Sequence, residues 1–425
     1  MDEERRGIFS AFNVRTLSSF KNPVYRLYYG AMMGQMAAMN MQMFARSWLM
    51  YRLTGSPLIM GAMSFAHAIP MLSLSLFGGV IADRVQKKYV MLFGQVGSTM
   101  VTLGVALTLT LGFIGPERTL TILGITMPSW SILVVASVFQ GTIMALMMPS
   151  RQAILPEIVG EEQLMNAVSL NTLGMNTFRI FAPAATGLLI NVLDYEGVYY
   201  VMTGLYVIAV AFVFFIPPTS TMTVRGGGAF QGIKEGFQYL RHETILIIIL
   251  IFTLFVVVLS MPYQFLLPVL CDRVLNVGEE QAGVLVSVSG IGAITASLIL
   301  ASLPNKKRGL MLLVSSVALG VALVFFSFST SWYLSMGLIV VIGITQTARM
   351  TLGNTLIQYY VDDEYRGRVM SIYMMEFGLT SFGTFAAGVM AEGIGVQWAV
   401  GSFAAVLVVM AILALAFLPR IRKLD

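Results

Sequence analysis

The chain has 425 residues, of which 57% are hydrophobic and only 11% are charged. A soluble globular protein of this length carries far more charge, so the composition excludes that class and indicates that lipid is the solvent. The formal net charge of +5 does not indicate nucleic-acid binding, because the basic residues are spread over many loops and tails instead of forming one face.

Hydrophobic segments long enough to cross a membrane recur along the whole chain. A spanning helix needs about 20 mainly apolar residues. Windows of that length predict twelve spans, at residues 26–50, 58–82, 89–112, 130–150, 167–191, 198–217, 245–271, 280–303, 309–328, 332–354, 369–391 and 397–419. The sequence therefore predicts an all-α integral membrane protein.

The amino-terminal residues do not suggest a secretory signal, and the cysteine content does not suggest a cofactor. Residues 1–22 are polar and mixed in charge, and they lack the short apolar core of a secretory signal peptide. Cys271 is the single cysteine, which excludes an intrachain disulfide and a thiolate metal cluster. We expect no cofactor and no metal.

The distribution of basic residues predicts the orientation in the membrane. Cytoplasmic loops are enriched in Lys and Arg, and most of these residues lie in loops on the same side as the amino terminus. Only Arg52, Arg118 and Arg273 lie in loops on the opposite side. We expect a multi-pass protein of the bacterial inner (plasma) membrane with both termini in the cytoplasm.

A segment rich in Pro, Gly and Thr near the middle of the chain, residues 216–230, reads as a linker. The following stretch has one apolar helical face, which predicts a helix at the cytoplasmic interface, with a short solvated helix as the alternative. The predicted domains are an amino-terminal six-helix bundle (1–217), a linker with an amphipathic helix (218–243) and a carboxyl-terminal six-helix bundle (244–425).

The two predicted bundles share a weak internal repeat. At one constant shift, Gly141 aligns with Gly343 and Glu162 with Glu364, in the segments that join the fourth span of each half to the fifth. Because six spans return the chain to its starting side, the halves are expected to be parallel repeats about an axis along the membrane normal.

The loop between the second and third spans carries a cluster of charged residues. The stretch GGVIADRVQKKYVML, residues 78–92, contains Gly79, Asp83, Arg84, Lys87 and Lys88. This resembles the signature loop of the major facilitator superfamily, G-x-x-x-D-R-x-G-R-K, and departs from it at Gln86, where the family usually has Gly.

Four further stretches resemble the enterobactin-exporter and macrolide-efflux branch of that superfamily. They are residues 48–62, 149–159, 234–243 and 363–378. The resemblance covers essentially the whole chain. It implies a twelve-helix secondary exporter of small, often amphipathic molecules, usually driven by the proton gradient.

The signature loop also suggests a gate. Asp83 lies at the carboxyl end of its helix, where the helix dipole disfavours a carboxylate. The eleventh span begins on the same side with a positive helix end, and Arg366 and Arg368 lie just before it. We expect Asp83 to form a latch with that helix end which breaks when the cytoplasmic face opens. The alternative is a solvated charge cluster that only sets topology.

Small residues predict a close contact between the fifth and eighth spans. Pro183 and Gly187 lie in the fifth span, and Gly290 and Gly292 lie in the eighth. The first pair resembles the glycine-proline motif of superfamily antiporters, although Ala182 replaces a glycine of the motif. Ordinary helix packing is the alternative.

Ionisable residues inside spans are candidates for function. We expect Arg46 to extend to the nearby membrane surface and His67 to be a hydrogen-bonded core residue. Arg179 lies deeper and could meet an anionic substrate. Arg349 and Glu376 lie in consecutive spans, and each would need the other if buried. Glu376 is the candidate proton carrier, and a permanent structural ion pair is the alternative.

Polar residues in several spans are candidates to line a central cavity. They are Gln35, Asn40, Gln140, Asn171, Asn176, Arg179, Gln264 and Gln346. The predicted function is export of a small amphipathic molecule, such as a drug or siderophore, by alternating access and proton antiport. The predicted partners are the substrate, the proton and the lipid bilayer, with the chain acting as a monomer.

Three other functions remain as alternatives. An importer on the same fold is the nearest. A membrane-embedded enzyme ranks low, because the chain has two histidines and one cysteine and lacks G-x-S-x-G and H-E-x-x-H motifs. A sensor ranks low because no loop is long enough for an output domain.

Overall fold

The computed structural model describes residues 18–122, 124–218, 229–303, 306–362 and 364–425. These residues are nearly all helical, and eight of their helices are long and apolar enough to cross a membrane. The predicted class, an all-α membrane protein, is confirmed.

The first half of the chain starts with a short 3-10 helix and three long α-helices. They are η1 (Ser18–Lys21), α2 (Pro23–Thr54), α3 (Pro57–Arg84) and α4 (Lys87–Thr110). Asn22 caps α2 by accepting hydrogen bonds from the backbone N–H groups of Val24 and Tyr25. Ser56 caps α3 in the same way, so both helices begin at a polar cap followed by proline.

Helix α5 (Ser131–Phe215) contains three of the predicted spans. Its 85 residues are interrupted by non-helical backbone at Gly160 (φ 70°) and Asp194 (φ 54°). These two residues divide α5 into helical segments 131–159, 161–193 and 195–215. Glycine has no Cβ, so the left-handed conformation at residue 160 is reached without strain.

A β-hairpin between α4 and α5 was not predicted from the sequence. Strands β1 (Thr119–Ile122) and β2 (Ile125–Pro128) pair antiparallel, with Thr119 opposite Pro128. Gly124, with φ 82°, lies in the turn. The short alternation of Thr with apolar residues suits a two-stranded ribbon.

The second half of the chain contains a linker helix followed by ten helices. They are α6 (Ala229–Leu240), α7 (Thr244–Ser260), α8 (Pro262–Phe265), α9 (Leu267–Arg273), α10 (Glu279–Ser302), α11 (Arg308–Phe328), α12 (Trp332–Tyr360), α13 (Arg366–Met374), α14 (Glu376–Ile394), α15 (Val396–Phe417) and α16 (Pro419–Arg422).

Two predicted spans are interrupted in the structure. The span predicted at 245–271 is divided into α7, α8 and α9, with Pro262 at the start of α8. The span predicted at 369–391 breaks at Met375.

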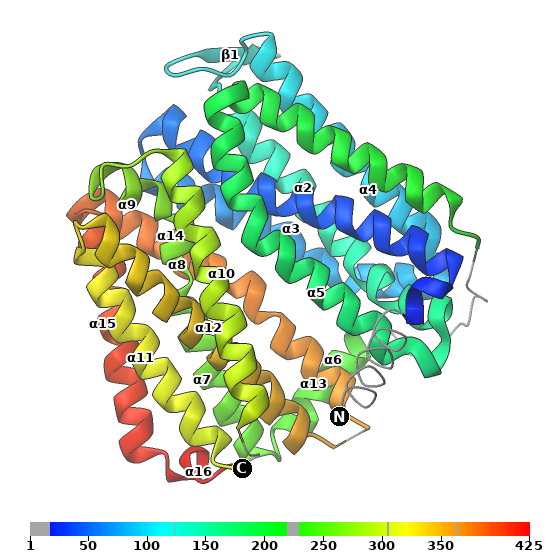
Figure 1. Ribbon diagram of the computed structural model, residues 1–425, viewed down its shortest axis with the longest axis vertical. Helices are drawn as coiled ribbons and strands as arrows, with labels where there is room; N and C mark the ends of the chain where they lie inside the picture. Colours follow the sequence, from blue (N-terminus) through cyan, green and yellow to red (C-terminus); the bar gives the residue numbers. More distant parts are fainter. Residues whose placement is uncertain (1–17, 123, 219–228, 304–305, 363) are drawn as a thin grey trace, which may run out of the picture.

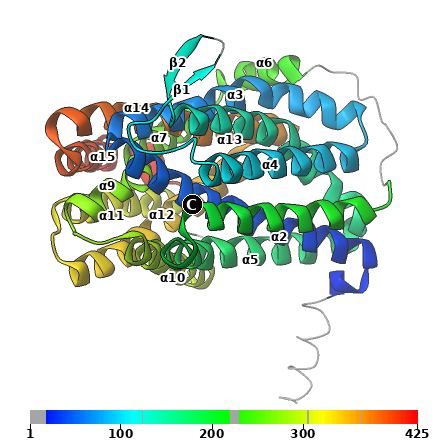
Figure 2. The same ribbon diagram turned by 90° about the horizontal axis from the view of Figure 1, so that it is seen from above.

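Two ends of the molecule can be distinguished in Figure 1. We call one end the hairpin face, formed by β1 and β2 and by residues 272–279, with Gly55 bound to Arg273 of that segment. The other is the linker face, formed by residues 84–87, α6 and α16. Figure 2 shows α2 and α4 of the first half on one side and α9, α11 and α15 of the second half on the other.

The two halves pack together through α3 against α14. A Cβ atom added at Gly61 would lie 3.0 Å from the Phe385 Cα atom, so glycine allows the two helices to approach closely here. The hydroxyl of Ser64 donates to that of Ser381 at 3.3 Å. Along α3 this contact continues to Leu72, which lies against Gly378, and therefore covers the part of the helix nearer the hairpin face.

The halves also pack through α5 against α10. Gly187 lies against the backbone of Glu279, and Gly290 lies against Ile180. Near Pro183, the Ala184 N–H donates to Ser287 Oγ at 3.2 Å. Proline disrupts the helix hydrogen bonds around it, which leaves this amide available to the opposite helix.

One of the small residues expected at this contact lies elsewhere. Gly292 lies against Val340 of α12, within the second half, rather than against α5. Gly290 and Gly292 point to different neighbours because two residues along an α-helix turn the direction by about 200°.

Candidate functional site

A small cavity lies between the two halves, near the middle of four helices. It is lined by Arg179 of α5, Tyr263 and Gln264 of α8, Ser289, Gly290 and Ala293 of α10, and Gly343, Gln346 and Thr347 of α12. Its volume is about 10 Å³, enough for about one water molecule. Three predicted cavity residues, Arg179, Gln264 and Gln346, meet here, together with Tyr263, which the sequence analysis missed.

The polar atoms of this cavity are not fully paired. Gln346 is buried, and its Oε1 atom has no hydrogen-bond partner among the described residues. Arg349 lies one turn further along α12, so it shares the face of Gln346. Only 2% of Arg349 is exposed, and its Nε atom has no partner in the described part of the chain.

Glu376 is buried close to Arg349 but is bound elsewhere. Only 5% of Glu376 is exposed, and its Oε1 atom accepts a hydrogen bond of 2.6 Å from the hydroxyl of Thr253 on α7. Within the described residues the structure has no ion pair between Glu376 and Arg349, although they interact electrostatically. The carboxylate and the guanidinium are thus neighbours that are not paired in this conformation.

The other predicted cavity residues do not reach the cavity. The amide of Gln140 donates to Ser98 Oγ at 3.3 Å, and that of Gln35 contacts Met147 Sδ at 3.9 Å. Asn40 donates to the carbonyl oxygen of Met36 in its own helix, and Asn171 accepts a hydrogen bond from the hydroxyl of Tyr25. Asn176 is exposed. All of these partners lie in the first half of the chain.

Arg46 does not extend to the membrane surface as the sequence analysis expected. It is 8% exposed, and its Nη1 atom donates to Ser137 Oγ at 3.3 Å. His67 lies at the same place, with its Nδ1 atom 3.1 Å from the carbonyl oxygen of Ser137. The Arg46 side chain turns inward because Ser137 of α5 offers a hydroxyl inside the first half. The number of residues between Arg46 and the end of its predicted span does not reveal this partner.

A polar network that we call the Arg52 network joins the two halves at the hairpin face. Arg52 of α2 binds Glu279 of α10 through two hydrogen bonds, of 2.8 Å and 3.2 Å. Its Nη1 atom lies 3.3 Å from Asp272 Oδ1. Tyr51 donates to Asp272 at 2.6 Å, and Tyr195 donates to Glu279 at 2.9 Å. Every contact crosses from one half to the other.

Two more polar contacts cross between the halves at the same face. Ser56 Oγ donates to Glu392 Oε2 at 2.8 Å, and Arg273 donates to the carbonyl oxygen of Gly55 at 2.7 Å. The sequence analysis placed Arg52 and Arg273 in loops on this side without pairing them. The opposite charges on loops of different halves were the sequence signal that could have indicated these contacts.

The two lysines of the signature loop are bound within the first half. Lys87 forms an ion pair of 2.6 Å with Glu157, and Lys88 donates to the carbonyl oxygen of Phe214 at 2.8 Å. Lys88 thereby caps the last turn of α5. Gly79 faces open space, Arg84 is exposed at the end of α3, and the side chain of Asp83 lies outside the described part of the structure.

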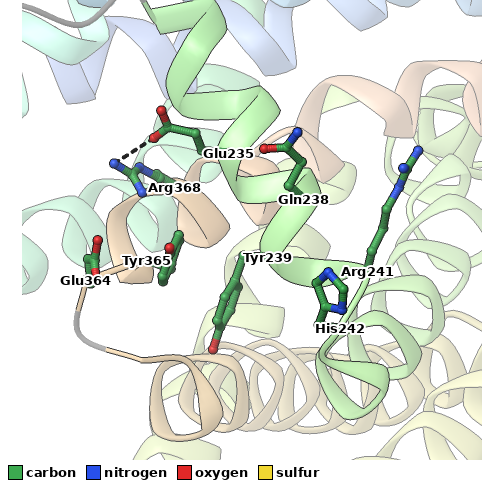
Figure 3. A pocket seen from close by; sticks show the side chains of 8 residues that line it. All are labelled: Glu235, Gln238, Tyr239, Arg241, His242, Glu364, Tyr365 and Arg368. Atoms are coloured by element: carbon green, nitrogen blue, oxygen red, sulfur yellow. Dashed lines mark ion pairs between the residues drawn. The ribbon is translucent and has the colours of Figure 1, made fainter.

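Arg366 and Arg368, the proposed partners of that loop, lie at the start of α13. Arg366 is exposed. Arg368 forms an ion pair of 2.8 Å with Glu235 of α6, and Figure 3 shows this pair beside the rings of Tyr239 and Tyr365. The two rings stack with centroids 4.3 Å apart. The linker helix is therefore fixed to the start of α13, beside a polar pocket of about 810 Å³.

We expect the contact between α5 and α10 to tolerate only glycine at residue 283. A Cβ atom there would meet the backbone of Pro183 and Ala184. Gly283→Val is expected to lower the free energy of unfolding by about 1–3 kcal/mol, as overpacking does. Thermal unfolding of the purified protein measures this. Gly104→Val is the matched control, because residue 104 faces open space, and an equal loss in both variants would contradict the prediction.

Comparison with known proteins agrees with this architecture. Residues 14–425 match the family model described as transmembrane secretion effector. The chain is 25% identical over 379 residues to the staphyloferrin A transporter of Staphylococcus aureus, covering 89% of this chain and 90% of that one. It is 24% identical over 394 residues to the multidrug efflux pump Tap of Mycolicibacterium fortuitum, covering 89% and 91%. A mutant of the nucleoside transporter NupG superimposes with a TM-score of 0.75 at 14% identity, covering 92% and 99%.

Proposed function

Because the chain belongs to the transmembrane secretion effector family of major facilitator transporters, we propose that it exports a small amphipathic molecule by proton antiport. The observation that carries this proposal is the buried, unpaired couple of Glu376 and Arg349 beside a cavity between the halves. A carboxylate that can pair with or separate from a guanidinium can bind and release a proton during the transport cycle.

The transport mechanism that fits this geometry is alternating access of two six-helix bundles. We take residues 1–217 as the first bundle, 218–243 as the linker and 244–425 as the second, which gives twelve spans. The glycine contacts and the Arg52 network hold the bundles together at the hairpin face. This conformation is the one expected of a carrier that is closed at the hairpin face and releases that closure to pass its substrate.

We assign the linker face to the cytoplasm of a bacterial cell and the hairpin face to the outside. The signature loop, α6 and α16 each bring basic residues to the linker face, which agrees with the enrichment of Lys and Arg in cytoplasmic loops. In this assignment both termini lie in the cytoplasm, and we take the structure to be the form that is closed to the outside.

A second gate closes the linker face in the other half of the cycle. In our proposal Asp83, at the end of α3, then approaches the start of α13, where the positive helix end and Arg366 offer partners. Lys87 and Lys88 keep the loop fixed to the first bundle meanwhile. The chain works as a monomer, since both bundles and the cavity between them come from one polypeptide.

The test is reconstitution of the full-length protein into lipid vesicles with an imposed pH gradient. A substrate among amphipathic drugs and siderophores should dissipate the gradient only in vesicles that contain the protein. The export direction is measured by substrate accumulation against its gradient in vesicles whose linker face is outside. Substrate accumulation that does not depend on the pH gradient would contradict proton antiport, and accumulation in the opposite sense would identify an importer.

A further inference from the structure

The centre of the molecule carries more positive than negative charge. Arg179 lines the cavity from α5, and Arg349 lies one turn from the cavity-lining residue Gln346. Glu376 is the carboxylate within electrostatic range of Arg349, and none of the described residues that line the cavity is acidic. The two guanidinium groups are therefore close enough to repel each other, and the carboxylate of Glu376 lies near Arg349.

That carboxylate forms no ion pair with Arg349 among the described residues of this conformation. Glu376 accepts its 2.6 Å hydrogen bond from Thr253, and Arg349 Nε is buried without a partner among the described residues. A buried guanidinium that is not hydrogen-bonded to a counter-ion is costly, by several kcal/mol in general. An anion that reaches Arg349 would offset this cost, whereas a neutral or cationic ligand would not.

The uncharged groups of the cavity also favour an oxyanion. Tyr263 and Thr347 present hydroxyl groups, and Gln264 and Gln346 present amides that can donate hydrogen bonds. Arg179 is exposed and lines the cavity, so it can meet a ligand before the buried Arg349 does. The cavity holds only about 10 Å³, so an entering group must displace side chains, and the bulk of the ligand must lie on the Arg179 side.

We infer that the central site takes its substrate by an anionic group, a carboxylate or a similar oxyanion, bound between Arg179 of the first half and Arg349 of the second. This inference rests on the proposed function, because it names the chemical class of the exported molecule. A bridging anion contacts both halves at once, which gives the bound substrate a means to bias their relative movement.

Two matched probes test this inference without any transport. The probes are 2-naphthoate and 2-naphthamide, which share the fused ring and differ in charge at neutral pH. Binding to the full-length protein in detergent is measured as a ligand-dependent rise of the unfolding midpoint. We expect 2-naphthoate to bind at least about tenfold more tightly than 2-naphthamide, as the loss of a charged hydrogen bond predicts.

Variants then locate the site. Arg179→Gln should reduce the affinity for 2-naphthoate about tenfold or more and leave 2-naphthamide unchanged, and Arg179→Lys should recover part of the loss. Arg118→Gln is the control, because it removes the same charge from the hairpin. Arg179 is preferred to Arg349, since it is exposed and its replacement leaves the core intact.

Three results would overturn the inference. They are equal binding of the two probes, no detectable binding of 2-naphthoate, and equal weakening by Arg118→Gln and Arg179→Gln. None of these results depends on the direction of transport or on proton coupling. A carrier that binds anions but fails the vesicle test can therefore be distinguished from an exporter of neutral molecules.

Discussion

Arg52→Gln is expected to open the hairpin face. The substitution removes the two hydrogen bonds to Glu279 and the ion pair with Asp272 that join α2 to α10 and α9. Arg52 is partly exposed, so each ion pair is expected to contribute about 1 kcal/mol or less. Loss of both should shift the ratio of open to closed molecules by about 5- to 30-fold.

Distances between spin labels on the two halves measure this shift. Leu111 and Tyr333 are exposed positions at the hairpin-face ends of α4 and α12, and pulsed electron spin resonance between labels there reports the opening. The buried native Cys271 is replaced by alanine in all samples. We expect Arg52→Gln to add a longer-distance population and Arg52→Lys to give an intermediate one, because lysine keeps the charge but not the fork of donors.

Two controls separate the network from general loss of charge. Arg118→Gln removes a charge from the same face without a contact between the halves, so its distances should match the parent. Glu279→Gln added to Arg52→Gln should have less effect than the sum of the single changes, because both act on one pair. Strict additivity, or an unchanged distribution in Arg52→Gln, would show that the network does not hold the face closed.

The sequence predicts the spans well because burial in lipid demands length and apolarity alone. Each predicted span falls mainly on helical residues of the structure, although several extend one or two residues past a helix end, and hydropathy does not detect breaks. The interruption at Met375 and the division of the predicted span 245–271 follow from packing and from Pro262. The hairpin at residues 119–128 was missed because strands of four residues carry almost no periodicity.

Function class was predictable because it depends on motifs spread over the whole chain. Membership of a transporter family confirms the predicted transporter, and the relatives are transporters rather than enzymes. The substrate site was less predictable. In a membrane protein, the spacing of polar residues along a helix does not show which of them face the lipid and which face the interior. Gln140 and Gln264 were therefore equal candidates to line the cavity. Gln140 lies within the first half of the chain and Gln264 in the cavity.

Long-range pairs were not predictable from one sequence. Arg52 and Glu279 are 227 residues apart, and their contact depends on how the two halves dock at the hairpin face. The same is true of Thr253 and Glu376, which are 123 residues apart. In the second case the sequence analysis chose Arg349 as the partner, because a charge suggests a counter-charge, whereas the structure gives the carboxylate a hydroxyl.

Glu376→Gln is expected to abolish proton-coupled transport and leave substrate exchange intact. Among the described acidic residues, Glu376 combines near-complete burial with a position inside a predicted span. Glutamine preserves the volume and can still accept the hydrogen bond from Thr253, so folding should be maintained while the proton site is lost. A permanent ion pair with Arg349, the alternative considered from the sequence, is not what this conformation has.

Two fluxes in the same vesicles measure the effect. Substrate-induced proton movement should fall to the level of protein-free vesicles in Glu376→Gln, while downhill exchange of substrate across the membrane should continue. Glu196→Gln is the matched control, because this carboxylate is exposed and lies two residues after the break in α5 at Asp194, and both fluxes should persist there. Thr253→Val is expected to impair coupling without abolishing it, because it removes the hydroxyl that holds the carboxylate away from Arg349. Undiminished proton movement in a folded Glu376→Gln protein would assign the coupling proton to another group, and loss of both fluxes would assign Glu376 to substrate binding or folding instead.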